Sequence, residues 1–221
     1  MADGDVQAVV FDLDGVLIDS EELWDEVRRD LAADSGRPWP AAATQAMLGM
    51  STAEWSAYLV DQVGSPGRPE DVASLVIDRM ADRYHARLPL LPGAVEAVQR
   101  LGQRWPLGLA TSSPRRLIDA VLEAAGLTSS FRVSVSTEEV TAGKPSPAVY
   151  LEAARRLGVD PRHGVAIEDS SNGLRAAAAA GLRVVAVPNV AFPPAEDALG
   201  LAAAVVGSLD DVTAELVTSL R

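Results

Sequence analysis

The stretch VVFDLDGVLIDS, residues 9–20, decides the fold of this chain. Its apolar half has the composition of a strand that is buried on both faces, as in a parallel sheet. The strand ends in Asp12 and Asp14, which project to the same side because strand residues two apart share a face. Two carboxylates about 4 Å apart repel each other by about 1 kcal/mol in water and about 4 kcal/mol at an effective dielectric of 20. A bound cation would relieve this repulsion, at the sheet edge where doubly wound folds hold ligands.

Two other interpretations of the paired aspartates need weighing. The DLDG motif is also compatible with a surface turn or a helix cap. An EF-hand calcium loop does not fit, because Val16 occupies the next alternate position and no bidentate glutamate stands at the twelfth. Features elsewhere in the chain decide between the turn and the cation site.

Apolar runs alternate with helical patterns along most of the chain, which predicts a doubly wound α/β core with a parallel, Rossmann-like sheet. One helix is expected to be capped by Ser113, to have Pro114 at its first position and to end at Gly126. SPAVYLEAARRLG, from residue 146 to residue 158, repeats this order. The expected strands are residues 6–13, 107–111, 131–136, 164–167, 184–187 and 203–206.

Residues 21–87 lack a convincing strand and contain amphipathic stretches such as EELWDEVRRDLAA. They predict an all-helical insert. LPLLPG, residues 88–93, cannot continue a helix and marks the return to the sheet. We therefore expect a core domain of residues 1–18 and 92–221 and a helical domain of residues 19–91.

Composition restricts the possible functions. A net charge of −12 argues against nucleic acid and anionic membranes as partners, since both require a basic surface. No apolar run approaches the roughly 20 residues of a membrane span. The absence of cysteine excludes disulfides, thiolate metal sites and a thiol nucleophile. Asp3 and Asp5 stand where a secretory signal would need positive charge, so a cytoplasmic protein is expected.

Polar residues also follow two other expected strands. Thr111 and Ser112 precede a helix, where hydroxyl and free N–H groups suit a phosphate, although the same LATSS motif can simply cap the helix. Glu168 and Asp169 end the strand of AIEDSSNG and could likewise be helix-capping residues. Two strands of one sheet that both end in acidic pairs favour a metal site.

Lys144 is the single lysine in a chain with 18 arginines. Arginine supplies nearly every cationic side chain in this sequence. The single exception suggests that the compact point charge of an ammonium group is needed at position 144. Lys144 follows the third expected strand, so its side chain can reach the same edge of the sheet. A phosphate-binding Walker A motif is excluded, because Pro145 stands where serine or threonine is required.

Taken together, FDLDGVLIDS, LATSS, the lysine of GKPSP and IEDS resemble the four signatures of the haloacid dehalogenase-like phosphatase superfamily, in the same order. The resemblance covers essentially the whole chain. The helical insert resembles the cap of the group that contains β-phosphoglucomutase and sugar-phosphate phosphatases. The resemblance implies an enzyme that acts on a small phosphorylated metabolite. We expect a monomer or weak homodimer.

The resemblance also implies a role for each signature residue. Asp12 would be the nucleophile that forms an aspartyl-phosphate, and Asp14 would act as general acid and base. Lys144 would neutralise charge on the nucleophile and the phosphoryl group. Thr111 and the Ser112 amide would bind phosphate oxygens, while Mg²⁺ would be held by Asp12, the Asp14 carbonyl and Asp169, with Glu168 nearby.

Departures from the mutase pattern favour a phosphatase for hexose 6-phosphates and related small phosphomonoesters. Thr52 stands where mutases carry an arginine, and Trp24 stands in place of an expected histidine. Asp14 argues against a dehalogenase, because it supplies an acid that dehalogenases lack at this position. Phosphonate hydrolysis through a lysine imine is excluded, because the insert contains no lysine. A β-phosphoglucomutase-like mutase remains the main alternative, followed by a non-catalytic phospho-ligand binding module.

Several other residues are expected to lie outside the chemistry. The two histidines are expected to be exposed. Three tryptophans are expected to pack between helices rather than line a cleft. Three arginines spaced four apart are expected to form a solvated helix face. These residues are His85, His163, Trp24, Trp39, Trp55, Arg79, Arg83 and Arg87.

Overall fold

The core is a parallel sheet in the order β3-β2-β1-β4-β5-β6, seen in a computed structural model that describes residues 6–47, 50–189 and 193–220. β1 lies inside the sheet and pairs with both β2 and β4. The chain builds outward through β2 and β3 and then crosses back to β4, so the strand order reverses beside β1. Ligands of doubly wound folds bind at such a reversal. The strands are β1 (Ala8–Phe11), β2 (Leu107–Thr111), β3 (Phe131–Ser136), β4 (Gly164–Glu168), β5 (Arg183–Ala186) and β6 (Ala204–Val205).

Both faces of the sheet are buried, which explains why the central strands are apolar throughout. Val9 and Phe11 of β1 belong to one hydrophobic cluster, and Ala8 and Val10 belong to the cluster on the other face. This alternation follows from the two-residue period of a strand. The doubly wound α/β core predicted from the sequence is confirmed.

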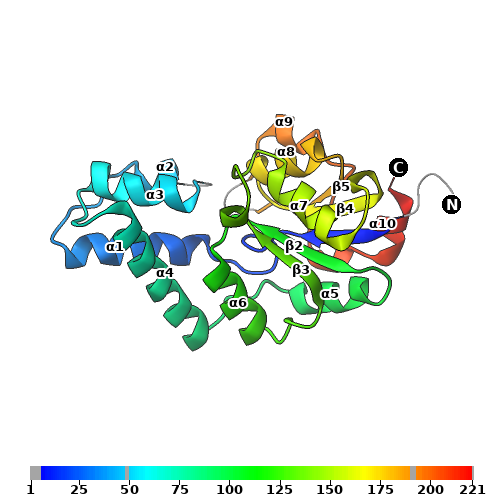
Figure 1. Ribbon diagram of the computed structural model, residues 1–221, viewed down its shortest axis with the longest axis horizontal. Coiled ribbons are helices and arrows are strands. Elements are labelled where there is room, and N and C mark those ends of the chain that lie inside the picture. The colour runs from blue at the N-terminus through cyan, green and yellow to red at the C-terminus, as the bar shows by residue number, and fades with distance from the viewer. Residues whose placement is uncertain (1–5, 48–49, 190–192, 221) are drawn as a thin grey trace.

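Helices cover the two faces of the sheet (Figure 1). α5 and α6 contribute buried residues to the cluster that contains Phe11, whereas α7 and α8 contribute to the cluster that contains Val10. These helices are α5 (Ala94–Gly102), α6 (Arg115–Ala124), α7 (Ala148–Leu157) and α8 (Ser171–Ala179). Two further helices, α9 (Glu196–Leu199) and α10 (Ala214–Ser219), lie near the C-terminus, and 3-10 turns span Thr137–Glu139, Pro161–His163 and Leu209–Asp211.

Helices without an intervening strand make up the described part of the insert, and Figure 1 shows them beside the sheet layers. α4 packs against α1, α3 and α6, so the insert is anchored to the core. The helices are α1 (Glu21–Asp34), α2 (Ala43–Met47), α3 (Thr52–Tyr58), a π-helical turn (Leu59–Val63) and α4 (Pro69–Ala86). The domain boundaries proposed from the sequence, 1–18 with 92–221 and 19–91, stay a prediction.

Several expected boundaries shift by one to a few residues. β1 covers only Ala8–Phe11, so Asp12 and Asp14 lie beyond the strand in the loop that follows it. α6 begins at Arg115 with Pro114 as its cap, so the expectation that Ser113 caps this helix is wrong. The Ser113 hydroxyl donates a hydrogen bond to Asp14 instead, and so does not cap the helix. Among the described residues, no helix combines the length and apolar character that a membrane span needs.

The structure gives the surroundings of both histidines and of two of the arginines that were expected to lie outside the chemistry. His85 is exposed, but His163 is half-buried, and its exposure was wrongly predicted. His163 immediately precedes β4 and therefore lies at the opposite sheet edge from the carboxylates. Arg79 and Arg83 form ion pairs with Asp34 and Asp30 of α1, so this face links two helices rather than only meeting solvent.

Candidate active site

Asp12 is the first residue after β1, and its backbone N–H donates to the carbonyl of Ile167 in neighbouring β4. This hydrogen bond continues the strand pairing by one position and fixes the direction in which Asp12 leaves the sheet. The Asp12 side chain is buried. The central strand of the core therefore presents a buried carboxylate at its carboxyl end.

Lys144 reaches this carboxylate from the loop before α7, as its position after the third strand predicts. Its ammonium donates to Asp12 Oδ1 at 2.7 Å and to Glu168 Oε1 at 2.6 Å. The Lys144 side chain is only 6% exposed. Burial disfavours the charged ammonium, but Asp12 and Glu168 outweigh burial and hold the pKa of Lys144 above its usual value.

Glu168, the last residue of β4, is fully buried and accepts hydrogen bonds at both oxygens. Oε1 accepts from Lys144 and from the Tyr150 hydroxyl at 2.7 Å. Oε2 accepts from the backbone N–H groups of Asp169 and Ser170 and from the Ser170 hydroxyl. Gly173 of α8 packs so close that a Cβ there would overlap the Glu168 carboxylate. These contacts fix Glu168 behind Lys144, where it positions the ammonium.

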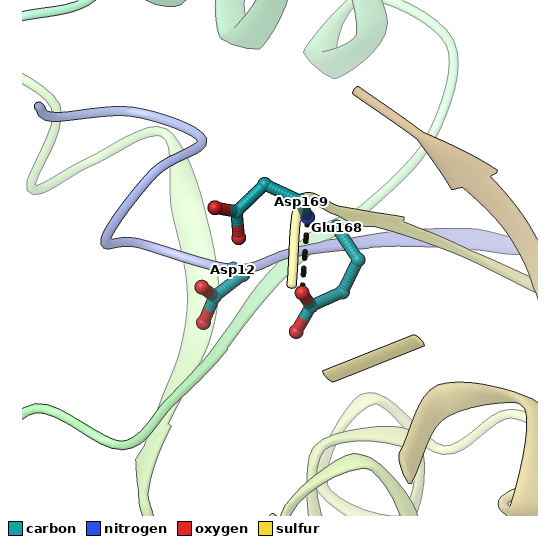
Figure 2. Close-up of side chains that lie close together, drawn as sticks. All are labelled: Asp12, Glu168 and Asp169. Carbon is teal, nitrogen blue, oxygen red and sulfur yellow. Dashed lines mark hydrogen bonds between the residues drawn. The ribbon is translucent and has the colours of Figure 1, made fainter. Parts of the chain in front are cut away.

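Asp169 completes a group of three carboxylates that fits a metal ion. One oxygen from each of Asp12, Glu168 and Asp169 lies within 4.8 Å of the others, and Figure 2 shows these side chains gathered beside β1 and β4. Asp169 Oδ1 is buried without a hydrogen-bond partner among the described residues. When ionised, the three carboxylates and the Lys144 ammonium leave two uncompensated negative charges. A divalent cation with a preference for oxygen ligands matches this donor set.

The pKa values of the buried carboxylates also favour a bound cation. Burial raises the pKa of Asp12 to about 8, although Lys144 pulls the pKa down. Burial, together with the neighbouring Glu168 and Asp12 charges, also holds the pKa of Asp169 well above its ordinary value. Burial is the largest cause of both shifts, and the single Lys144 ammonium does not offset it. A bound cation would reverse them.

Gly15 makes room for this arrangement. Its φ of +81° lies in the left-handed region that favours glycine, and its N–H donates to the Ile18 carbonyl at 2.8 Å. A Cβ at this position would also overlap the Asp169 carboxylate. The glycine of the DLDG motif is therefore required by the backbone turn and by the approach of Asp169.

Asp14 lies apart from the three-carboxylate group and is held by two hydroxyls. Ser20 donates to Asp14 Oδ1, and Ser113 donates to Asp14 Oδ2, each at 2.5 Å. Ser20 comes from the end of the loop after β1, and Ser113 comes from the loop after β2. The Asp14 carboxylate thus has a fixed orientation, while its proposed metal contact through the backbone carbonyl stays a prediction.

One cavity joins the remaining candidate residues. Thr111 ends β2, and its Oγ1 accepts the Ser113 N–H at 3.0 Å, which shapes the turn that carries Ser112. The cavity has a volume of about 490 Å³, and Glu168 is not among the residues that line it. Its lining includes Asp12, Asp14, Thr111, Ser112, Lys144 and Asp169. Six of the seven predicted site residues therefore share one cavity, and the seventh lies behind it.

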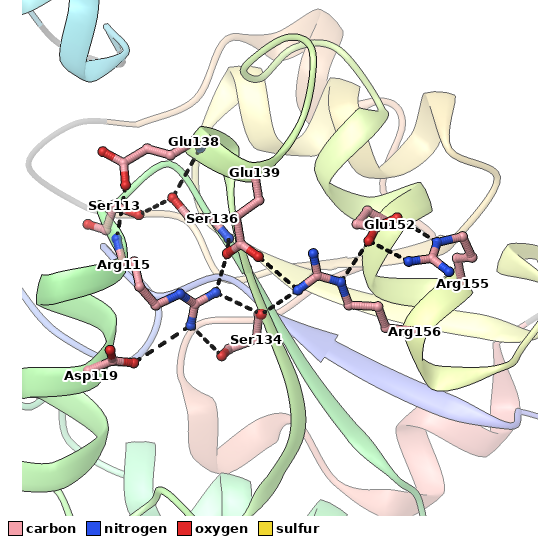
Figure 3. A network of polar contacts seen from close by, with 10 residues as sticks. All are labelled: Ser113, Arg115, Asp119, Ser134, Ser136, Glu138, Glu139, Glu152, Arg155 and Arg156. Atoms are coloured by element: carbon pink, nitrogen blue, oxygen red, sulfur yellow. Dashed lines mark hydrogen bonds and ion pairs between the residues drawn. The ribbon is translucent and has the colours of Figure 1, made fainter.

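A polar network secures the loop that carries Ser113 (Figure 3). The Ser136 hydroxyl donates to the Ser113 carbonyl at 2.7 Å, and the Ser136 N–H donates to Glu139 at 3.0 Å. Arg115 and Arg156 both donate to the Glu139 carboxylate. The network ties the ends of β2 and β3 to α6 and α7.

The sequence did not identify the residues that donate hydrogen bonds to the carboxylates of Asp14 and Glu168 and so fix their orientation. Ser20 and Ser113 orient Asp14, and Tyr150 contacts Glu168. Ser20 and Ser113 each had a visible signal, as the last residues of the FDLDGVLIDS and LATSS signatures, but Ser20 was given no role and Ser113 was interpreted as a helix cap. Trp24 and Trp55 are buried between helices as expected, with ring centroids 5.8 Å apart. Both also line a smaller cavity of about 90 Å³ beside Asp14.

Known proteins resemble the chain over most of its length. Hexitol phosphatase B of Escherichia coli is 39% identical over 189 residues, which cover 83% of this chain and 84% of that protein. The phosphorylated carbohydrates phosphatase of Thermotoga maritima is 33% identical, over 80% of this chain and 82% of that protein. The crystal structure of CbbY from Rhodobacter sphaeroides in complex with phosphate matches with a TM-score of 0.83 and 28% identity, over 94% of this chain and 96% of that one.

The family model for haloacid dehalogenase-like hydrolases matches residues 6–181, which include every candidate site residue. The match spans β1 to the end of α8 and includes the insert. This protein therefore belongs to the haloacid dehalogenase-like hydrolase family, and its relatives place it among the phosphatases of that family.

Proposed function

We propose that the protein is a Mg²⁺-dependent phosphatase that hydrolyses small sugar phosphates, such as hexose 6-phosphates, through an aspartyl-phosphate on Asp12. The observation that carries the proposal is the contact between the Lys144 ammonium and Asp12 Oδ1, 2.7 Å long, in a cavity that Asp14, Thr111 and Ser112 also line. The names of the hexitol and carbohydrate phosphatases among the relatives support sugar phosphates as the substrate class.

In the first half of the reaction, a carboxylate oxygen of Asp12 bonds to phosphorus while the ester P–O bond of the substrate breaks. The leaving oxygen takes a proton from Asp14, whose carboxyl group Ser20 and Ser113 keep in one orientation. Lys144 offsets the negative charge on Asp12 and on the phosphoryl group as they approach. Thr111 and Ser112 bind the phosphoryl oxygens from the cavity wall.

In the second half, water attacks phosphorus and the bond between phosphorus and Asp12 breaks. Asp14 takes the proton that the water loses, which returns the acid to its starting form. Inorganic phosphate leaves, and the Asp12 carboxylate is restored. Residues of the helical insert exclude other water during the first half.

Asp12, Asp169 and the backbone carbonyl of Asp14 would hold Mg²⁺, with Glu168 close behind them. The buried, unpartnered Asp169 Oδ1 supports this assignment. When bound, Mg²⁺ supplies positive charge that stabilises the transferring phosphoryl group.

A phosphosugar mutase is the second candidate, and one observation favours it. Arg28 of α1 lines the smaller cavity beside Asp14, where a cationic side chain could grip a second phosphate. Arg79 and Arg83, which also lie in the insert, pair instead with acidic residues of α1. Thr52, at the position where mutases carry an arginine, lines the same cavity and has no charge to offer.

The two functions separate in one assay. The protein is given hexose and hexitol 6-phosphates, and in parallel β-glucose 1-phosphate with a bisphosphate primer, each with Mg²⁺ or with EDTA. A molybdate assay measures free phosphate, and a coupled dehydrogenase measures glucose 6-phosphate. We expect Mg²⁺-dependent phosphate release from the 6-phosphates and little isomerisation. Isomerisation that outpaces phosphate release would establish the mutase instead.

A further inference from the structure

Arg28 is a buried cation that the proposed chemistry does not use. It is 8% exposed, and its guanidinium carbon lies 4.9 Å from the ring centroid of Trp24 and 5.1 Å from that of Trp55. Within the described residues, no ion pair includes Arg28, and its Nε is buried without a hydrogen-bond partner. Two aromatic faces therefore hold the guanidinium in place, but they do not satisfy its N–H groups. Leaving the buried Nε unpaired is costly, so a ligand that accepts hydrogen bonds from the guanidinium would be stabilised there.

The cavity beside Arg28 opens toward the reacting groups. The small cavity that Arg28, Trp24 and Trp55 line shares Asp14, Glu21 and Ser112 with the larger cavity that contains Asp12 and Lys144. In the proposed reaction Asp14 protonates the leaving oxygen. Because Asp14 lines both cavities, the small cavity adjoins the position where the leaving oxygen would lie.

Glu21 limits which ligands can bind there. Its carboxylate has no hydrogen bond or ion pair among the described contacts and lines both cavities. A second phosphate could pair with Arg28, but it would also meet the carboxylate of Glu21. Hydroxyl groups avoid this conflict, because each can accept from the guanidinium and donate to the carboxylate.

We propose that Arg28 and Glu21 form a hydroxyl-binding subsite for the leaving group, so that the enzyme selects phosphomonoesters of neutral polyols. This inference rests on the proposed phosphatase function and adds the recognition of the alcohol. Trp24 and Trp55 are positioning residues that keep the guanidinium facing the cavity. Arg28 donates to one hydroxyl of the leaving group, and Glu21 accepts from a neighbouring one.

The test compares two substrates in the full-length protein with Mg²⁺. A hexitol 6-phosphate offers hydroxyls to the subsite, and phenyl phosphate offers none. For Arg28→Met, which keeps an apolar side chain between the tryptophans, we expect kcat/KM for the hexitol phosphate to fall roughly tenfold to a hundredfold, the effect of losing one charged hydrogen bond. The kcat/KM for phenyl phosphate should change by less than about threefold.

Two further variants test whether a loss of activity in Arg28→Met comes only from a disturbed fold. Arg28→Lys keeps the charge but loses the planar fork, so it should fold and show a smaller selective loss. Arg29→Met, at the next position, removes an exposed side chain that pairs with Asp25 and should leave both substrates unaffected. Melting temperatures of all variants are measured alongside.

Each outcome decides one point. Equal losses on both substrates in Arg28→Met and Arg28→Lys would show that Arg28 only supports the fold, which overturns the inference. A wild-type preference for a hexose bisphosphate that Arg28→Met abolishes would show a second-phosphate site, which also overturns it. If the wild-type protein releases no phosphate even from phenyl phosphate, the proposed function fails. If the wild type hydrolyses phenyl phosphate but Arg28→Met loses no activity selectively on the hexitol phosphate, the subsite is wrong and the phosphatase function stands.

Discussion

Single residues of the candidate site occupy positions that few other side chains could fill. Lys144 is enclosed by Asp12, Glu168 and Tyr150, at 2.7, 2.6 and 3.4 Å from its ammonium. An ammonium donates in three directions from a single atom, which matches three partners around one point. A guanidinium is planar and larger, so it does not fit this buried space.

The first prediction concerns this lysine. Lys144→Arg should lower kcat/KM for phosphate release by roughly a hundredfold or more, the scale of losing one electrostatic stabiliser. The reverse exchange at an exposed position, Arg68→Lys, breaks only a surface pair with Asp71 and serves as the control. Near wild-type kinetics in Lys144→Arg would mean that the solitary lysine reflects composition alone.

The residues of the candidate site could be predicted from the sequence to different extents. Asp12, Asp14, Glu168 and Asp169 could be found because they form two acidic pairs at or just beyond the ends of apolar runs, and parallel strands bring such positions to one edge. Arg28 could not be found, because nothing in a helical pattern tells which of many arginines faces a cavity. That distinction depends on how α1 packs against α3, which only the folded chain determines.

Hydrogen bonds between elements hold the loop after β2 that carries Ser113. Glu139 follows β3 and accepts hydrogen bonds from the Ser136 N–H, Arg115 and Arg156 (Figure 3). Burial alone would raise the pKa of Glu139, but these three donors outweigh burial and lower the pKa from 4.5 to about 2. The ionised carboxylate is therefore favoured in the folded state over the unfolded one.

The second prediction is a pH dependence with a definite sign. Because the folded pKa lies below the unfolded one, the Glu139 charge stabilises the fold above about pH 4.5, and this contribution is lost as the pH falls toward about 2. The melting temperature of Glu139→Gln should lie below that of the wild type at pH 6, and the gap should shrink on acidification. Thermal melts across this range measure it. A gap that stays constant from pH 6 to pH 3 would contradict the assigned role.

Helix starts show where sequence patterns mislead at the scale of elements. The Ser-Pro pairs at residues 113–114 and 146–147 predicted serine caps, yet both helices begin one residue later with the proline as the cap. Ser113 donates its hydroxyl to Asp14, and the Ser146 hydroxyl accepts the Ala148 N–H at 3.4 Å. A tertiary partner that is absent from the local sequence decided the orientation of Ser113.

At the scale of the whole molecule, an acidic protein must bind an acidic substrate. The net charge of −12 repels phosphate esters, and the carboxylate group adds to this repulsion at the site itself. The family and the fold were both predictable from four short motifs, because their order follows the order of the strands. The domain boundaries stay a prediction, as does the expected monomer or weak homodimer.

The third prediction follows from the uncompensated charge. Mg²⁺ should raise the melting temperature, because a ligand that binds only the folded state stabilises it by about 2.7 kcal/mol at a hundred times its Kd. Asp169→Asn removes a proposed ligand and should reduce this shift, while NaCl at matched ionic strength should not reproduce it. A wild-type melting temperature that is the same in Mg²⁺ and in EDTA would contradict the metal site.

Trapping the phosphorylated enzyme tests the central claim most directly. The protein is mixed with a hexitol 6-phosphate and Mg²⁺, quenched in acid during turnover, and digested for mass spectrometry. We predict a phosphoryl adduct on the peptide that contains Asp12. Asp12→Asn, a nearly isosteric change, should keep a melting temperature close to the wild-type value while it loses both the adduct and phosphate release. Phosphate release by Asp12→Asn at a rate comparable to the wild type would contradict the account.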